Sequence, residues 1–313
     1  MAPITVNVDN FARVESDTMI AKMLPIVGGL GVFHHDRQLA PLDQQPVIRQ
    51  NRDTLYSVAI VDISGGATLT IPEYGDRYLS AMVINQDHYI NRVFHSAGTH
   101  HLTVEEFDTD FVIVGVRILF DPTSETDIAE VHSLQDGLAI TVGAQREFVL
   151  PDTDAASHEQ VRHALLELST TMGGYSQCFG RVDEVDPVRH LVGSASGWGG
   201  LPDAEASYLG VHPGLANGRY TMTFRDVPAD AFWSLSVYNG DGYFTSNDLG
   251  VYNVNSVFGT WNGDGSITVH LGDFDDSVPN RIPLPDGWNL LIRLYRPRLD
   301  ELVTWTAPTI QSA

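Results

Sequence analysis

Alternating hydrophobic and polar positions dominate two stretches of the chain and predict β-strands there. Between residues 47 and 119, the runs SVAIVDI, ATLTIP, RYLSAMVIN and FVIVGVRILF carry β-branched or aromatic residues at alternating positions. After residue 217 the pattern returns in YTMTF, FWSLSVY, SITVHL and WNLLIRLY. Short strands separated by turn signals favour two sandwich-like β regions over a parallel α/β sheet.

Helical spacing of apolar residues occurs in the remaining stretches. The segment from Asp9 to Met23 carries an apolar stripe and predicts an N-terminal helix that ends before Pro25. A second stripe runs from Ile128 to Leu138, and a third follows Ser157, the expected N-cap. A short helix is expected around Val188 to Val192.

These patterns divide the chain into four parts. Residues 1–45 form the N-terminal helix and its lead-in, and residues 46–150 form a β-sandwich domain. Residues 151–215 form a helical region, and residues 216–313 form a second β domain. A chain of 313 residues is long enough for two domains that each bury their own core.

Composition and charge exclude several partners. The formal net charge is −22, and this field repels phosphate backbones and anionic lipids, so we expect neither nucleic acid nor membrane as a partner. No apolar run approaches the roughly 20 residues that span a bilayer. Cys178 is the single cysteine, which excludes an intrachain disulfide, and with no secretory signal in the sequence we expect a cytoplasmic location.

The densest polar run lies where an apolar strand begins. Its members are Asn51, Arg52, Asp53, Thr54 and Tyr56. Buried hydrogen-bonding groups destabilise a fold unless each finds a partner. The run therefore indicates either a buried polar network or a functional site.

Alternation in the last β region separates an apolar face from a polar one. In FWSLSVY, Trp233 lies on the apolar face and Tyr238 on the opposite face. In WNLLIRLYRP, Arg293 and Tyr295 lie opposite the face that must form the core. We expect both to face solvent or another domain, where an arginine flanked by aromatic residues suits a carboxylate. An interdomain salt bridge is the alternative explanation.

The run VINQDHYINR is interpreted as a strand in the same way. Alternation places Asp87 and Tyr89 on one polar face with Asn85 and Asn91, and His88 on the other face. A histidine beside a carboxylate suits general-base chemistry. Neighbouring residues of a strand point in opposite directions, however, so Asp87 is not the natural partner of His88.

No motif in the sequence indicates a metal or a cofactor. The tandem pairs His34-His35 and His100-His101 lack the spacing that aims two imidazoles at one ion. The sequence contains neither a GxSxG nor an HExxH motif. We therefore expect no cofactor, no metal, and no serine or cysteine nucleophile; a metal site that combines histidines from different segments is the alternative.

Seven motifs occur in an order that resembles a known family. They are NRDTLYS, INQDHY, VHSLQDG, DPVRHLVGSASGWGG, FWSLSVYN, NGDGSITV and GWNLLIRLYRPR. The chain resembles the bacterial two-domain family catalogued as domains of unknown function 1254 (N-terminal) and 1214 (C-terminal). The resemblance extends from about Phe11 to Pro308. It places the NRDTLY motif on Asn51 to Tyr56, the FWS motif on Phe232 to Ser234 and the RLYRP motif on Arg293 to Pro297.

The resemblance implies a mainly β fold, with an immunoglobulin-like β-sandwich, a small helical region and a C-terminal jelly-roll sandwich. This agrees with the elements predicted from periodicity. The general function of the family is unassigned, so the resemblance informs the fold more than the activity.

The residues suit a cofactor-independent enzyme that acts by acid-base chemistry in a pocket between the two β domains. Such an enzyme would be a lyase, an isomerase or a cyclase acting on a small organic molecule. The expected catalytic residues are Asp53, Tyr56, Asp87, His88 and Tyr89. The expected substrate-binding residues are Asn51, Arg52, Trp233, Tyr238, Arg293 and Tyr295. Asp53 would act as the base, Tyr56 or Tyr89 as the proton donor, and Arg293 as the carboxylate or oxyanion clamp.

Two other classes of protein fit the same residues. The chain is alternatively a non-catalytic protein that binds a small molecule or a carbohydrate through Trp198, Trp233, Tyr238 and Tyr243, a reading that rests on fold-level analogy. It is otherwise a structural assembly protein in which the polar motifs join two β domains. Edge strands of sandwiches are often buried between protomers, so a homo-oligomer is compatible with either reading.

Overall fold

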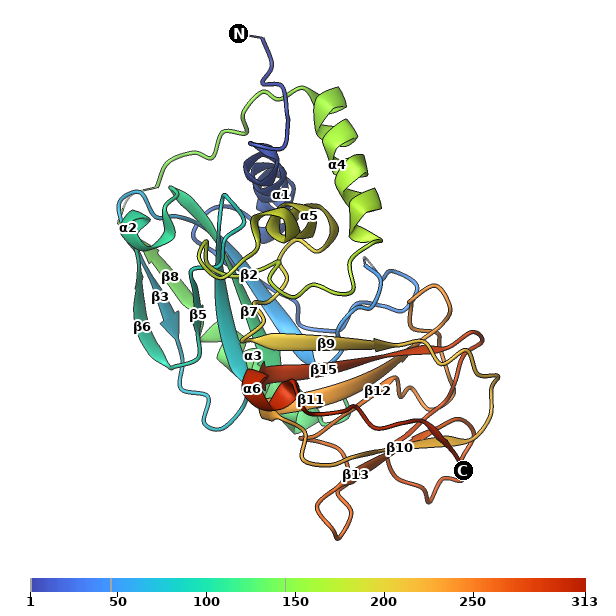
Figure 1. The fold of residues 1–313 in the computed structure, drawn as a ribbon. Helices are drawn as coiled ribbons and strands as arrows, with labels where there is room; N and C mark the ends of the chain where they lie inside the picture. The colour runs from blue at the N-terminus through green and yellow to red at the C-terminus, as the bar shows by residue number, and fades with distance from the viewer. Residues whose placement is uncertain (1, 46, 144) are drawn as a thin grey trace. The chain divides into compact units, whose positions relative to one another are not determined.

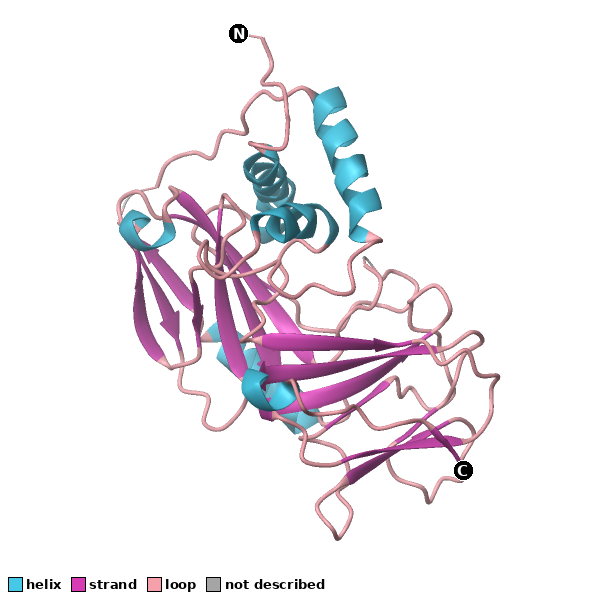
Figure 2. Ribbon diagram, in the orientation of Figure 1, coloured by secondary structure: helices cyan, strands magenta, loops and turns pink. Residues whose placement is uncertain are grey.

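The computed structural model describes residues 2–45, 47–143 and 145–313. The fold is mainly β, as predicted, and divides into two compact units (Figures 1 and 2). The N-terminal unit combines Met1–Arg37 with Leu55–Asp203, and the C-terminal unit combines Gln38–Thr54 with Ala204–Ala313. The C-terminal unit is therefore discontinuous in sequence, because a short segment from the first part of the chain belongs to it.

Two β-sheets form the β part of the N-terminal unit. The strands are β1 (Phe33–His35), β2 (Thr54–Asp62), β3 (Ala67–Ile71), β4 (Leu79–Asn85), β5 (Arg92–Phe94), β6 (Gly98–Leu102), β7 (Phe111–Leu119) and β8 (Ala139–Val142). One sheet has the order β1-β2-β7-β4-β5, and the other has the order β6-β3-β8. The pairs β1–β2, β4–β7, β4–β5, β3–β6 and β3–β8 are antiparallel.

Five helices accompany these sheets in the described part of the N-terminal unit. They are α1 (Phe11–Val27), α2 (Val104–Phe107), α3 (Glu125–Asp136), α4 (Ala155–Ser169) and α5 (Pro187–Ser196). Helices α1, α4 and α5 share a small apolar core that includes Phe11, Leu165 and Val192. Glu15 of α1 is buried and accepts a hydrogen bond from His158, at 2.8 Å, so a polar contact adds to this packing.

Two helix boundaries differ from the prediction. Helix α1 passes through Pro25 and ends at Gly28, whose φ of 84° and backbone bond to Leu24 form a left-handed cap. A proline in the last turn removes one hydrogen bond, which a helix packed on its neighbours tolerates at that position. Helix α4 is capped by Asp154 rather than Ser157, because the Asp154 carboxylate accepts from the Ser157 N–H at 2.9 Å.

The C-terminal unit contains two four-stranded sheets. Its elements are β9 (Ala206–Val211), β10 (Tyr220–Phe224), β11 (Ala229–Tyr238), β12 (Asn253–Asn255), β13 (Ile267–Leu271), β14 (Arg281–Ile282), β15 (Asn289–Pro297), α6 (Leu299–Leu302) and β16 (Gln311–Ser312). The sheet orders are β12-β11-β15-β9 and β14-β13-β10-β16. Strands β13 and β14 pair in parallel, and the other pairings described for this unit are antiparallel.

The core of the C-terminal unit joins the inner faces of its two sheets. It contains Trp233 and Leu235 of β11, Ile292 of β15, Met222 of β10 and Val269 of β13. The alternation predicted for β11 and β15 is thereby confirmed. Each such side chain contributes about 1.5–3 kcal/mol when fully buried, which specifies the strand register because a one-residue slip would move the whole set out of this core.

Candidate functional site

Asp53 is the centre of a buried hydrogen-bond network in the C-terminal unit. Its side chain is 0% exposed, and its carboxylate accepts from Ser234 Oγ at 2.6 Å. It also accepts from the side-chain amides of Asn253, at 2.7 Å, and Asn255, at 3.3 Å. Ser234 belongs to β11 and the two asparagines to β12, so Asp53 ties the Gln38–Thr54 segment to this sheet. Another molecule reaches the carboxylate only if this packing opens.

Arg293 makes a second set of bonds between the same segment and β15. It is 2% exposed and donates to Ser236 Oγ at 3.0 Å and to Tyr238 OH at 2.8 Å. It donates further to the backbone oxygen of Arg49, at 2.6 Å. Burial alone disfavours the cation, but Tyr238, Tyr295 and Asp53 hold the pKa of Arg293 above its ordinary value. The guanidinium is therefore charged and satisfied by groups of its own unit.

Asn51 completes this arrangement. Its side-chain amide donates to Tyr295 OH at 3.1 Å and to Thr54 Oγ1 at 3.0 Å, while its oxygen accepts from the Asp53 N–H at 2.8 Å. Alternation correctly placed Arg293 and Tyr295 opposite the core. Both are nevertheless 2% exposed, because the segment that carries Asn51 covers this face of the sheet. A pattern within one strand does not reveal which distant segment covers it.

The aromatic candidates lie in different surroundings. Trp233 is part of the core, where its ring stacks on Phe224 with centroids 4.1 Å apart. Tyr238 is fully buried. Tyr56 belongs to β2 in the N-terminal unit, where the guanidinium carbon of Arg117 lies 5.3 Å from the centre of its ring. These residues therefore do not share one surface.

Asp87, His88 and Tyr89 lie in a turn, which corrects the interpretation of this run as a single strand. Strand β4 ends at Asn85, and His88 has a φ of 66°. Asn85 Oδ1 accepts from the backbone N–H groups of Asp87, at 3.0 Å, and Tyr89, at 2.9 Å. Asparagine commonly stabilises turns in this way, and the alternation argument overlooked that property. The Asp87 carboxylate pairs with Arg13 of α1 at 2.6 Å.

His88 is buried in a stack of rings. Its ring lies 5.4 Å from Trp198 and 5.6 Å from His190, measured between centroids. Its Nδ1 is 2.8 Å from Ser194 Oγ, and its Nε2 accepts from the Gly199 N–H at 2.9 Å. Burial, with a smaller contribution from His190, lowers the pKa of His88 to about 3. His88 is neutral at pH 7, with both ring nitrogens engaged.

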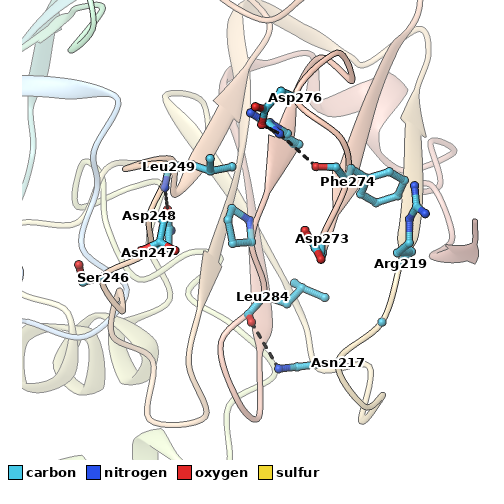
Figure 3. Close-up of a pocket in the computed structure, with 14 residues that line it drawn as sticks. Asn217, Arg219, Ser246, Asn247, Asp248, Leu249, Asp273, Phe274, Asp276 and Leu284 are labelled. Carbon is cyan, nitrogen blue, oxygen red and sulfur yellow. Dashed lines mark hydrogen bonds and ion pairs between the residues drawn. The ribbon is translucent and has the colours of Figure 1, made fainter.

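An open pocket in the C-terminal unit was not predicted from the sequence. It has a volume of about 890 Å³ and lies where several loops meet at the sheet that contains β10, β13 and β14 (Figure 3). Its walls come from residues 217–219, 246–249, 272–274, 276, 281, 283 and 284. A volume of this size accommodates a small organic molecule.

Three charged side chains of the pocket form no ion pair in the part of the chain that the structure describes. The carboxylates of Asp248 and Asp273 are exposed and have no hydrogen bond or ion pair among the described residues. The guanidinium of Arg219 lies over the ring of Phe274, 4.4 Å from its centre (Figure 3). Arg281, by contrast, is engaged with Asp276 at 2.6 Å. The pocket thus offers two free acceptors and one positioned donor.

Close backbone packing shapes one side of the pocket. Gly272 has a φ of 113°, and a Cβ atom there would lie 1.9 Å from the carbonyl oxygen of Gly218. Only glycine fits such an approach. Apart from Arg281 of β14, the pocket residues lie in loops without periodicity, so the available sequence signal was the run DFDD at residues 273–276, where an aromatic residue interrupts acidic ones.

The described residues contain no group of three or more His, Cys, Asp or Glu side chains arranged to hold a metal ion. Among the same residues, no helix combines the length and the apolar character that crossing a membrane requires.

Comparisons with known proteins relate the chain to proteins of unassigned function. Residues 30–103 match the family model described as "Protein of unknown function (DUF1254)", and residues 212–299 match "Protein of unknown function (DUF1214)". The resemblance inferred from the seven motifs is thereby confirmed, in the predicted N-terminal and C-terminal order. No curated protein matches the chain.

Two solved structures share the fold. The VPA0106 protein from Vibrio parahaemolyticus is similar with a TM-score of 0.74 and 18% identity, over 98% of this chain and 97% of that one. An uncharacterised protein from Burkholderia cenocepacia is similar with a TM-score of 0.55 and 14% identity, over 96% of this chain and 86% of that one. Identities this low bear on the fold alone.

Proposed function

Since the chain combines a DUF1254 region with a DUF1214 region, neither of known function, we propose a function from geometry: the C-terminal unit binds a small polyhydroxylated molecule. The observation that carries this proposal is the 890 Å³ pocket with its free Asp248 and Asp273 carboxylates and its Arg219–Phe274 pair. The pocket is a binding site, and the chain is a non-catalytic ligand-binding protein.

The chemistry of the pocket suits hydroxyl groups. A carboxylate accepts from two neighbouring hydroxyls, and a guanidinium donates to a hydroxyl oxygen, so Asp273 and Arg219 complement a polyol. Leu249, Pro283 and Leu284 add apolar wall against which the carbon skeleton of a sugar packs. The two carboxylates against one free guanidinium disfavour an anionic ligand in this pocket.

The acid-base hypothesis has less support from geometry. A general base must reach the proton that it removes, and Asp53 is fully enclosed by Ser234, Asn253 and Asn255. These bonds support a structural role in the C-terminal unit. The enzyme hypothesis stays a prediction, and it requires that this network open when substrate binds.

The fold types of the two units, the partners and the location are part of the same proposal. We expect an immunoglobulin-like sandwich in the N-terminal unit and a jelly roll in the C-terminal unit, supported by two-layered sheets around an apolar core in the latter. The acidic charge supports the expectation that neither nucleic acid nor membrane is a partner. A cytoplasmic location and a homo-oligomer are part of this expectation.

Ligand-observed NMR with the full chain tests the pocket. Mono- and disaccharides at millimolar concentration are screened by saturation transfer, and the affinity of each one that binds is then measured. We expect a dissociation constant in about the millimolar range, because the pocket is open and ordering a flexible polyol offsets part of the contact energy. Asp273→Asn weakens binding by about tenfold, the value of one charge-assisted hydrogen bond.

The matched control is Asp275→Asn, two residues away on the same exposed loop and outside the pocket lining. It changes the net charge equally and leaves the affinity unchanged. If both substitutions weakened saccharide binding equally, the effect would be one of general charge. If no saccharide showed saturation transfer, the proposal would be refuted. Arg219→Gln is a second variant, which removes the positive charge of the pocket and is expected to weaken saccharide binding as well.

A further inference from the structure

Arg52 occupies a separate position in the C-terminal unit, between two aromatic rings. Its guanidinium carbon lies 5.0 Å from the centre of the Tyr252 ring and 5.5 Å from that of Phe244. The two rings meet at 66° with centroids 5.6 Å apart, so they form a corner that holds the cation. Both rings are buried in a small cluster that also contains Leu42, which fixes the corner.

The guanidinium is short of hydrogen-bond partners. The hydrogen bond described for it goes to the backbone oxygen of Ala40 at 3.5 Å, the long limit for such a bond. The chain has 40 acidic residues for 18 basic ones, yet among the described residues no carboxylate pairs with Arg52. Half-burial without a counter-charge lowers the pKa of Arg52, whereas a partner anion would raise it. Arg52 is half-buried and uses one long hydrogen bond for its five N–H donors, which leaves donors for a further acceptor.

The backbone on both sides of Arg52 is held in place. Asn51 accepts from the Asp53 N–H at 2.8 Å and donates to Tyr295 at 3.1 Å. Asp53 is anchored on the other side by Ser234 at 2.6 Å. The cation is therefore pre-organised, which lowers the entropic cost of binding a ligand.

We propose that Arg52, with Tyr252 and Phe244, forms a binding site for the carboxylate of a small organic acid. A planar carboxylate matches the in-plane N–H edge of a guanidinium through two parallel bonds. The partly exposed side chain of Leu42, which packs against these rings, favours an acid with an apolar body. The strongly negative chain disfavours dianions such as phosphate, so the ligand carries a single charge. This site is independent of the polyol pocket.

Titration of the full chain with benzoate, acetate and benzyl alcohol, followed by ligand-observed NMR, tests the site. Benzoate binds best, because it presents both the carboxylate and an apolar ring. Acetate binds more weakly, and benzyl alcohol, which lacks the charge, binds at least about tenfold more weakly than benzoate. Arg52→Gln weakens benzoate by about tenfold or more for the same reason. Arg52→Lys, which keeps the charge without the planar fork, gives an intermediate affinity.

Arg225→Gln is the control for charge, since Arg225 is exposed and paired with Asp264 at 2.6 Å. It leaves benzoate affinity unchanged. Circular dichroism and melting temperature verify that each variant is folded. Equal binding of benzyl alcohol and benzoate would overturn the proposal, and so would full benzoate affinity in folded Arg52→Gln. Loss of benzoate in Arg219→Gln with retention in Arg52→Gln would assign the acid to the other pocket and also overturn it.

Discussion

Replacing Asp53 with alanine removes one acceptor that three donors share, of which Ser234 and Asn255 are buried and Asn253 is half-buried. The hydroxyl of Ser234 and the side-chain amides of Asn253 and Asn255 all lose this acceptor. Hydrogen bonds to a charged group contribute about 1.5–3 kcal/mol each, and the bond from Asn255 is long at 3.3 Å. Arg293 also loses a nearby counter-charge. We expect Asp53→Ala to reduce the free energy of unfolding by about 4 kcal/mol, close to the cost of breaking a buried charged pair.

Urea unfolding followed by tryptophan fluorescence measures this loss in the correct unit. Four of the five tryptophans belong to the C-terminal unit, so the signal reports mainly its unfolding. With a slope of about 2 kcal/mol per molar urea, the midpoint falls by about 2 M. Asp53→Asn keeps one oxygen acceptor, so its free energy of unfolding falls by less, about 1–2 kcal/mol. The exposed control Asp275→Ala stays within about 0.5 kcal/mol of the parent protein.

A loss below about 1 kcal/mol for Asp53→Ala would refute the reasoning, because the network would then contribute little to folding. The carboxylate would in that case be held in place for another purpose. General-base chemistry at Asp53 would regain support, and the Asp53→Asn variant would be the one to assay for lost turnover against candidate substrates.

Two further predictions concern the N-terminal unit. Because burial lowers the pKa of His88 to about 3 from its ordinary 6.5, the stability that the neutral ring contributes is present above pH 6.5 and is lost as the pH falls toward 3. The free energy of unfolding, measured at several pH values below about 6.5, should fall by up to about 1.4 kcal/mol per pH unit more steeply in the parent than in His88→Asn; parallel slopes would contradict this. Gly200→Ala should cost about 1–3 kcal/mol, because its Cβ would lie 2.2 Å from the Phe179 ring. Gly173→Ala meets no atom within 4 Å and should change thermal stability little, so equal melting temperatures of the two variants would exclude the steric argument.

Periodicity predicted the elements that bury one regular face. Trp233 and Leu235 on β11, and Ile292 on β15, alternate with polar residues and lie in the core as expected. The same argument failed at His88, where the Asn85 side chain stabilises a turn within an apparently continuous run. Local side-chain hydrogen bonds of this kind compete with a strand and leave no mark on hydrophobic alternation.

The surroundings of the candidate site depend on contacts that no local pattern contains. The polar run at residues 51–56 indicates either a buried polar network or a functional site. Its hydrogen-bond partners in the folded chain decide between these two. Asp53 and Ser234 are 181 residues apart in the sequence. The polyol pocket was not predicted at all, because its walls come from four separate segments that lie mostly in loops. Loops lack periodicity, and the charges that stay unpaired in them become evident only once the chain is folded.

The discontinuous C-terminal unit has a consequence for the order in which the chain assembles. During synthesis the Gln38–Thr54 segment leaves the ribosome long before β11, and 181 residues at ~5–20 residues per second correspond to roughly 10–40 s of waiting. In that interval Asp53 and its neighbours have no sheet to join. A fragment that starts at Ala204 would conversely present Arg293 without the backbone oxygen of Arg49. The C-terminal unit therefore completes its fold only when the internal Gln38–Thr54 segment meets the sheet formed by the last third of the chain.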